Sequence, residues 1–466
     1  MIRIFNQYVS IKSLLLTFVE DVLIVCSVIF AVRLRFWNNP EEFRSYIALP
    51  DFGLQVLVIL AAFQISFYYM NLHGLSIIRR QLQFLVSLGQ AAGAASLVLG
   101  LVYYLFPYFL IGRGVFFIAL VLMVASVALS RAALDRAWQI SALQENVLIL
   151  GDGDLAVTVA REIERRGDLS CKIVGFVGES LEAASEAPAS PILGTPAQLE
   201  EIVRARKVHR IIVALRDQRG RLPVRELVRI RVQGVRVEDA PSTMAALTGR
   251  VWLDTVKPSW FVFSDGFRRA RLIVLCKRIF DIIFSLIGLV LSLPIMALVA
   301  AAIRLESRGP VVYKQSRVGL GGRCFNVLKF RSMRADAEAK SGAQWAQSDD
   351  PRITLVGRYI RKFRLDELPQ FINVIRGDMS FVGPRPERPV FVDMLRKEIS
   401  YYDERHSVRP GLTGWAQVQY PYGASIEDAF RKLEYDLFYL KNMSLSFDLA
   451  IIFQTIRTVC TGNGAR

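Results

Sequence analysis

Long apolar stretches constrain this chain of 466 residues more than any other feature of its sequence. Four of them occupy its N-terminal part, and each is close to the ~20 residues that a helix needs to cross the hydrocarbon core of a bilayer. They lie at residues 13–35, 52–72, 83–108 and 110–131. The sequence therefore predicts a membrane protein in which residues 1–136 form four transmembrane helices.

Basic residues beside these stretches indicate their orientation. A cytoplasmic N-terminus places Arg3, Lys12, Arg79, Arg80, Arg131 and Arg136 inside, and Arg33, Arg35, Arg44 and Arg113 outside. This small excess inside follows the positive-inside rule. Glu20 and Asp21 fall within the first stretch. One interpretation is a polar site in the bundle. The other, which we favour because an unpaired charge in lipid is costly, is pairing with another helix or displacement toward the interface.

The charge balance and the rare residue types narrow the chemistry. With 58 Lys and Arg against 42 Asp and Glu, the net charge is +16. This excess fits nucleic acid, anionic lipid headgroups or phosphorylated substrates, and the apolar stretches favour the last two. The 5 cysteines are widely separated and the chain has only 3 histidines, so neither a disulfide framework nor a zinc cluster is predicted. Any catalysis is expected to use carboxylates and basic groups.

After Arg136 the pattern becomes that of a βα domain over residues 145–250. The strand-like segment NVLILGDG runs into Gly151 and Gly153, and the amphipathic segment VTVAREIERRG follows. Further strand-like segments, CKIVGFVGE, VHRIIVAL and GVRVEDA, alternate with helical ones, which predicts a Rossmann-like parallel sheet. The glycines fit a phosphate near a helix N-terminus, so Gly151 and Gly153 are candidates for a nucleotide site. An oligomerisation module or a relic of the fold are alternatives.

A fifth apolar run, residues 282–303, follows a linker at 251–271 and contains Pro294 near its middle. Proline removes one helical hydrogen bond, so a bend is expected there. We favour a re-entrant helix over about 275–304 that enters and leaves the membrane on one side. A straight fifth transmembrane helix is the alternative, and it would place the two soluble parts on opposite sides.

Basic residues dominate the segment after this run. Between Arg304 and Asp336 they include Arg317, Lys329 and Arg331, and the segment also holds Gly319, Gly321 and Gly322. One interpretation is attraction to anionic headgroups, worth about 1 kcal/mol per cation. The other is a pyrophosphate-binding cradle in which Arg331 chelates oxygens with two N–H groups and Lys329 adds a point charge.

The segment RKFRLDELPQFINVI places two carboxylates, Asp366 and Glu367, at a predicted helix start beside Pro369. The helix dipole and nearby cations are expected to keep both ionised. An ionised carboxylate can attack phosphorus, and its neighbour can bind a divalent cation. An acidic helix cap is the alternative, and spacing alone favours it. In GDMSFVGPRPERP, two prolines stiffen the chain around Arg385, which suits phosphate binding.

Four blocks carry a specific resemblance. They are KRIFDIIFSLIGLVLSLPIMALVAAAIRLESRGPVVYKQSRVG, KFRSMRADAE, RLDELPQFINVIRGDMSFVGPRP and RPGLTGWAQV. In this order they resemble the bacterial sugar transferases, which are monotopic phosphoglycosyl transferases acting on polyprenol phosphate. The resemblance covers residues 272–466. The whole layout is similar to the long form of the family, and YYLFPYFLIGRGVFF and FSDGFRRARL resemble members associated with the PEP-CTERM exopolysaccharide system.

The resemblance implies roles for particular residues. It makes Asp366 the nucleophile and Glu367 its partner in holding Mg²⁺, and it maps the break of the re-entrant helix onto Pro294. Here Leu293 separates Ser292 from the proline, whereas the family often has serine directly before it. Four cations match positive positions of the blocks and are predicted to contact phosphate, namely Lys329, Arg331, Arg385 and Arg317.

The implied fold is a membrane protein of the α plus α/β class, with a four-helix transmembrane bundle, a Rossmann-like βα domain and a mostly α catalytic domain. The implied reaction moves a hexose 1-phosphate from a UDP-sugar to undecaprenyl phosphate and releases UMP, as the first membrane step of exopolysaccharide, capsule or O-antigen synthesis. The implied setting is the bacterial inner membrane with the soluble domains in the cytoplasm, a homodimer, and no nucleic acid. A membrane-anchored NAD-dependent nucleotide-sugar dehydratase and a non-catalytic scaffold of polysaccharide assembly are the alternatives.

Overall fold

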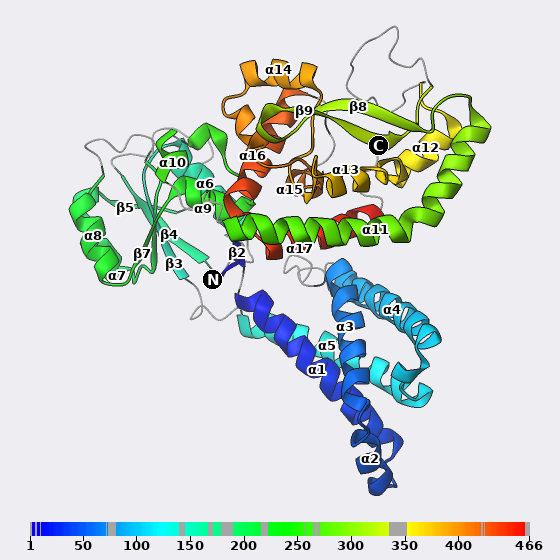
Figure 1. Cartoon of the computed structure of the whole chain (residues 1–466). Coiled ribbons are helices and arrows are strands. Elements are labelled where there is room, and N and C mark those ends of the chain that lie inside the picture. The colour runs from blue at the N-terminus through cyan, green and yellow to red at the C-terminus, as the bar shows by residue number, and fades with distance from the viewer. Residues whose placement is uncertain are drawn as a thin grey trace. The chain divides into compact units, whose positions relative to one another are not determined.

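The computed structural model describes most of the chain (Figure 1). The described residues are 2–4, 7–9, 11–70, 72, 81–138, 145–165, 171–178, 190–215, 222–256, 258–263, 267, 271–334, 352–420, 423 and 425–461. They divide into two compact units, of which the first runs essentially to Ala240 and the second from Pro241 to the C-terminus. Each unit is described by itself.

The first unit begins with two short paired strands and five helices. These are β1 (Ile2–Ile4), β2 (Gln7–Val9), α1 (Ile11–Arg35), α2 (Pro40–Ile47), α3 (Phe52–Tyr69), α4 (Gln81–Leu105) and α5 (Arg113–Trp138). Four of these helices, α1, α3, α4 and α5, are long and apolar enough to cross a membrane. They share one hydrophobic core, in which Ile24, Phe63, Leu88 and Met123 are almost fully buried. The predicted helices therefore form close to their predicted bounds.

The acidic residues of the first helix pair with other helices, as expected. Glu20 is fully buried and accepts a hydrogen bond of 2.9 Å from Nε of Arg131 on α5. Asp21 accepts one of 2.6 Å from the amide of Gln64 on α3. Pairing satisfies these carboxylates within the helix core, so they belong to the packing of α1.

The predicted βα domain contains a five-stranded parallel sheet in the order β5-β4-β3-β6-β7. Its elements are β3 (Glu145–Leu150), α6 (Asp154–Arg165), β4 (Cys171–Val177), β5 (Ile192–Gly194), α7 (Leu199–Ala205), β6 (Arg210–Val213), α8 (Val224–Val232) and β7 (Arg236–Asp239). The central strands β3 and β6 are mostly buried because helices cover the sheet, which explains the nearly continuous apolar sequence of β3. The prediction of a parallel sheet is confirmed.

The second unit is mostly helical, with two small two-stranded sheets. Its elements are α9 (Ala240–Thr248), α10 (Pro258–Phe263), α11 (Arg271–Glu306), β8 (Val312–Val318), β9 (Cys324–Phe330), α12 (Leu355–Lys362), α13 (Gln370–Arg376), β10 (Ser380–Val382), α14 (Pro389–Glu398), β11 (Gly411–Thr413), α15 (Trp415–Gln419), α16 (Ile426–Asn442) and α17 (Leu445–Thr461). Ala245 and Val251 share a core with Trp415 and Phe438. The end of the predicted βα domain and the start of the predicted linker thus pack with the catalytic domain.

Helix α11 contains the fifth apolar run and continues through Pro294 for 36 residues. Figure 1 shows that it changes direction in its later part, which a proline explains because one backbone hydrogen bond is missing. Its earlier part packs on α13, where Gly288 faces the ring of Phe371 so closely that a Cβ would lie 2.8 Å from it. Its later part packs on α12 and β9 through Val299 and Ile303. Both parts of α11 therefore contact the same unit.

Most of the apolar surface of α11 remains uncovered. Only 17% of the most apolar stretch of this helix is buried inside the structure. The exposed side chains include Leu272, Leu275, Ile279, Ile283, Leu286, Val290, Leu291, Leu293 and Leu298. A continuous apolar surface of this kind is expected to contact lipid.

Candidate active site

Two adjacent carboxylates lie on a short 3₁₀ turn between α12 and α13. Arg364 adopts the left-handed backbone conformation, with φ 52°, and so ends α12 and turns the chain into Leu365–Glu367. The regular helix α13 begins at Gln370, a few residues after the predicted start. On this helix, Phe371 and Val374 are buried. Asp366 and Glu367 thus precede a helix N-terminus, as the sequence predicts.

The helix α13 is fixed to the strand that carries Lys329. The side chain of Asn373 is fully buried and accepts a hydrogen bond of 2.9 Å from the N–H of Leu328. It also donates one of 2.8 Å to the carbonyl oxygen of Asn326. A buried amide with satisfied bonds sets the register between two elements, so Lys329 is held opposite the carboxylates.

Three cations surround Glu367. Its Oε1 lies 2.7 Å from the guanidinium of Arg385 and 3.2 Å from Nζ of Lys329, and its Oε2 lies 3.9 Å from the guanidinium of Arg364. Asp366 is only 9% exposed, and it makes no hydrogen bond or ion pair with any other described side chain. Glu367 is therefore neutralised by cations, whereas Asp366 is buried without a direct partner among the described side chains.

This difference moves the two acids apart. Burial, together with the adjacent charge of Glu367, raises the pKa of Asp366 to about 6 against the pull of Lys329, Arg361 and Arg385. Burial alone would raise the pKa of Glu367 as well, but Arg385, Lys329 and Arg364 lower it far below its usual range. The pKa of Asp366 moves upward because burial outweighs the cations, yet it stays below neutral pH, so both acids are ionised there as the sequence predicts. At neutral pH Asp366 is still mostly ionised.

The predicted phosphate-binding cations take different places. Lys329 and Arg385 meet at Glu367, but Arg331 is buried and donates to the carbonyl oxygens of Arg308 and Ser307 at 3.0 and 2.9 Å, which ties down the end of α11. Arg317 donates to the carbonyl oxygen of Pro386 at 3.0 Å. The structure thus brings two of the four cations to the carboxylates. Phosphate contacts of Arg331 and Arg317 stay a prediction.

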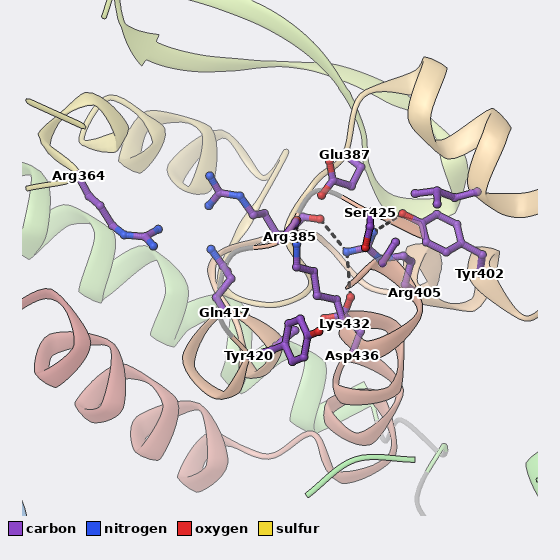
Figure 2. Close-up of a pocket in the computed structure, with 14 residues that line it drawn as sticks. Arg364, Arg385, Glu387, Tyr402, Arg405, Gln417, Tyr420, Ser425, Lys432 and Asp436 are labelled. Carbon is purple, nitrogen blue, oxygen red and sulfur yellow. Dashed lines mark hydrogen bonds and ion pairs between the residues drawn. The ribbon is translucent and has the colours of Figure 1, made fainter. Parts of the chain in front are cut away.

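A pocket opens beside Arg385 (Figure 2). Arg364 and Arg385, which also contact Glu367, belong to its lining, so pocket and carboxylates form one site. Lys432 adds a further cation, and Gln417 and Tyr420 present an amide and an aromatic ring. The phenol of Tyr420 donates to Asp428 at 3.0 Å, which fixes the ring. Cations on one side and a ring with an amide on the other suit a phosphorylated ligand that carries a flat base.

The described residues contain no group of three or more His, Cys, Asp and Glu side chains that could hold a metal ion by themselves. Mg²⁺ usually needs less than that, because it keeps several waters and takes one or two carboxylates together with substrate phosphates. Asp366 and Glu367 provide such a pair, so the residues fit a Mg²⁺ ion that arrives with a phosphorylated substrate.

The glycine turn after β3 has a structural explanation. Gly151 has φ 144°, and a Cβ there would lie 2.6 Å from the carbonyl oxygen of Ala214. Gly153 is exposed and has open space around it. Asp152 and Asp154 stand beside these glycines at the start of α6. Two carboxylates at this position oppose a diphosphate.

Comparisons with known proteins match two separate parts of the chain to family models. A family model described as bacterial sugar transferase matches residues 272–462, and one described as CoA-binding domain matches residues 75–241. The chain is 30% identical, over 97% of its length and 94% of the relative's, to a UDP-glucose:undecaprenyl-phosphate glucose-1-phosphate transferase of Xanthomonas campestris pv. campestris.

Two further relatives match over shorter regions. A UDP-N-acetylgalactosamine-undecaprenyl-phosphate N-acetylgalactosaminephosphotransferase of Aeromonas hydrophila is 46% identical over 52% of this chain. An undecaprenyl-phosphate glucose phosphotransferase of Komagataeibacter xylinus is 34% identical over 68% of it. The chain spans 56% and 59% of the lengths of these two relatives.

The described residues around Gly151 do not fit the diphosphate of a CoA ligand, because Asp152 and Asp154 are negative.

The opposite pKa shifts predict opposite effects on stability. The ionised form of Asp366 destabilises the fold as the pH rises from 3.8 through about 6, whereas ionised Glu367 stabilises it wherever the pH is above its ordinary value. Asp366→Asn should therefore raise the thermal unfolding midpoint at about pH 7.5, and Glu367→Gln should lower it. Calorimetry of the two detergent-solubilised variants checks this. A lower midpoint for Asp366→Asn would contradict the assigned environment.

Proposed function

The chain belongs to the bacterial sugar transferase family, and from this premise we propose that it transfers a sugar 1-phosphate from a UDP-sugar to undecaprenyl phosphate, releasing UMP. The observation that carries the proposal is the unequal carboxylate pair beside a cationic pocket. A pair of acids with separated pKa values marks two different chemical tasks. A dehydratase would instead require a dinucleotide at the glycine turn, where two aspartates stand.

Asp366 is the nucleophile of the proposed reaction. It is ionised at neutral pH and buried, and it has no hydrogen bond or ion pair with another side chain in the part of the chain that the structure describes. In the first step an Asp366 oxygen attacks the β-phosphorus of the donor, the bond from that phosphorus to the bridging oxygen breaks, and UMP leaves. In the second step a phosphate oxygen of undecaprenyl phosphate attacks the same phosphorus and releases the Asp366 carboxylate. The product is undecaprenyl-diphospho-sugar.

The surrounding cations orient the donor and stabilise the charge that develops on its phosphates. Arg385 lines the pocket and contacts Glu367 together with Lys329, so we assign both cations to the donor phosphates. The nucleoside lies in the pocket, with its base against Tyr420 and Gln417. Mg²⁺ bound by Asp366, Glu367 and the diphosphate would supply further neutralisation of the leaving group.

The position of α11 supports a re-entrant helix. The path along α11 from residue 278 to residue 303 is about 37 Å long at 1.5 Å per residue, more than the ~30 Å of the hydrocarbon core. Both ends of this stretch nevertheless pack on the same unit, through Arg278 on α13 and Ile303 beside Phe330. A helix that crosses the membrane cannot do this, whereas one that dips into a single leaflet can. We place the catalytic unit at the cytoplasmic face of the inner membrane, where nucleotide sugars are made.

The covalent intermediate is the first test. Wild-type enzyme mixed with a UDP-sugar alone should release UMP and gain the mass of a phosphosugar on the peptide that contains Asp366. Asp366→Asn should lose at least about 1,000-fold of the transfer activity. A panel of UDP-sugars, with and without undecaprenyl phosphate and Mg²⁺, identifies the donor. Wild-type activity in Asp366→Asn, or kinetics that require both substrates at once without an adduct, would overturn the mechanism.

The pH profile is the second test. Because the nucleophile must be ionised, kcat/KM should rise with pH up to about 6 and then level off, falling about tenfold per pH unit on the acidic side. Donor turnover measured at constant ionic strength from about pH 4.5 to 8 gives the profile. An acidic limb centred near the ordinary aspartate value of 3.8 would contradict the role of burial at Asp366.

The third test is the topology of α11. In a variant whose 5 native cysteines are replaced by serine, Arg271→Cys and Arg308→Cys flank the helix on exposed positions. A membrane-impermeant maleimide should label both from the cytoplasmic side of inverted vesicles. Trp37→Cys, which follows α1 and is 63% exposed, is the control and should react only from the other side. Labelling of positions 271 and 308 from opposite sides would show a crossing helix.

A further inference from the structure

A buried cluster beside Arg385 belongs to the lining of the same pocket, although none of its members has a role in the proposed chemistry. It consists of Arg405, Asp436 and Tyr402, which are only 7%, 2% and 2% exposed. They come from the 3₁₀ segment Tyr402–Ser407 and from α16. A buried charge pair is often replaceable by apolar residues without loss of stability, so its presence calls for another explanation.

Arg405 connects this cluster to Arg385 (Figure 2). Its guanidinium donates a hydrogen bond of 2.9 Å to the main-chain carbonyl oxygen of Arg385 and one of 2.7 Å to the hydroxyl of Tyr402. The same nitrogen that reaches Arg385 lies 2.9 Å from a carboxylate oxygen of Asp436. The planar guanidinium is thereby held on both of its terminal nitrogens, which leaves it little freedom.

The neighbouring backbone explains why a side chain is needed here. Arg385 stands between Pro384 and Pro386, and neither proline has an N–H that could anchor the chain. The segment is held by its carbonyl oxygens instead. Those of residues 384, 385 and 386 accept hydrogen bonds of 2.9, 2.9 and 3.0 Å from the N–H of Gly411 and from the guanidinium groups of Arg405 and Arg317.

We propose that Arg405, oriented by Asp436, is a positioning residue that fixes the backbone of Arg385 so that its guanidinium meets Glu367 and the donor phosphates. The inference rests on the proposed function. Arg405 does not touch the reacting atoms. Removing its hydrogen bond lets the carbonyl of residue 385 shift, and a misplacement of about 1 Å at a reacting centre can cost about 100-fold in rate.

The test compares conservative variants at the two ends of the cluster with a matched control. Arg405→Lys keeps the charge beside Asp436 but loses the fork, and Asp436→Asn keeps the size but loses the charge. Glu434→Gln is the control, because Glu434 is also fully buried on α16 and pairs at 3.0 Å with Arg250, which does not line the pocket. Each full-length variant is assayed for kcat, for KM of the UDP-sugar and for thermal unfolding.

Arg405→Lys and Asp436→Asn should lower kcat by at least about tenfold while KM changes by less than about threefold, because the donor still binds and only alignment is lost. Glu434→Gln should lower stability to a similar extent with kcat within about twofold. Tyr402→Phe, a milder change that removes one acceptor of Arg405, should lower kcat in the same direction. This variant keeps the proposal testable if Arg405→Lys does not fold.

Two results would overturn the positioning role. One is an unchanged kcat in folded Arg405→Lys and Tyr402→Phe. The other is a loss of kcat in Glu434→Gln equal to that in Asp436→Asn, which would show a general effect of destabilising α16. Failure of the proposed function is distinguishable, because the wild-type enzyme itself would then release no UMP.

Discussion

The active site depends on the repulsion between two carboxylates that are adjacent in the chain. Two like charges at this spacing cannot both be stabilised by the same surroundings inside a protein. The cations Arg385, Lys329 and Arg364 contact Glu367, while Asp366 is buried and pairs with no side chain among the residues that the structure describes. The result is one acid that is permanently charged and one that is ionised but poorly solvated. Such a carboxylate is a better nucleophile than one that three cations neutralise.

The cations converge because several distant segments are fastened to each other. Lys329 comes from β9, which Asn373 ties to α13, and Arg385 follows β10, whose last residue is Val382. The carbonyl oxygen of Val382 accepts hydrogen bonds from Lys277 on α11 at 3.0 Å and from Tyr439 on α16 at 3.1 Å. The membrane-facing helix is therefore a direct support of the strand that leads to Arg385. Its apolar exterior and its polar interior contacts serve the same site.

The sequence predicts the parts of this protein that periodicity and composition determine. The apolar helices, the parallel sheet and the pairing of Glu20 follow from such patterns. The upward pKa shift of Asp366 could not be predicted, because burial depends on contacts with segments far away in the chain. Arg331 and Arg317 look like phosphate ligands in a basic run, yet Arg331 donates to backbone carbonyl oxygens just after α11. Arg317 donates to Gln315, Glu387 and the carbonyl oxygen of Pro386. The burial of Arg405 could not be predicted, because nothing in the segment YYDERHS distinguishes a buried arginine from an exposed one.

The same physics explains why the lipid acceptor and the nucleotide donor can meet at one aspartate. Undecaprenyl phosphate holds its phosphate at the headgroup plane, whereas a nucleotide sugar stays in water. Because both parts of α11 pack beneath a single unit, the lipid-facing surface of the helix and the carboxylates on η7 (Leu365–Glu367) belong to one packed body. Leu365 and Leu368, which bracket the two acids, pack against the core that contains Val299 and Ile303 of α11. In the proposed arrangement, the depth of this helix in the leaflet sets the height of Asp366 above it, and the proposed nucleophile need not move between its two proposed substrates.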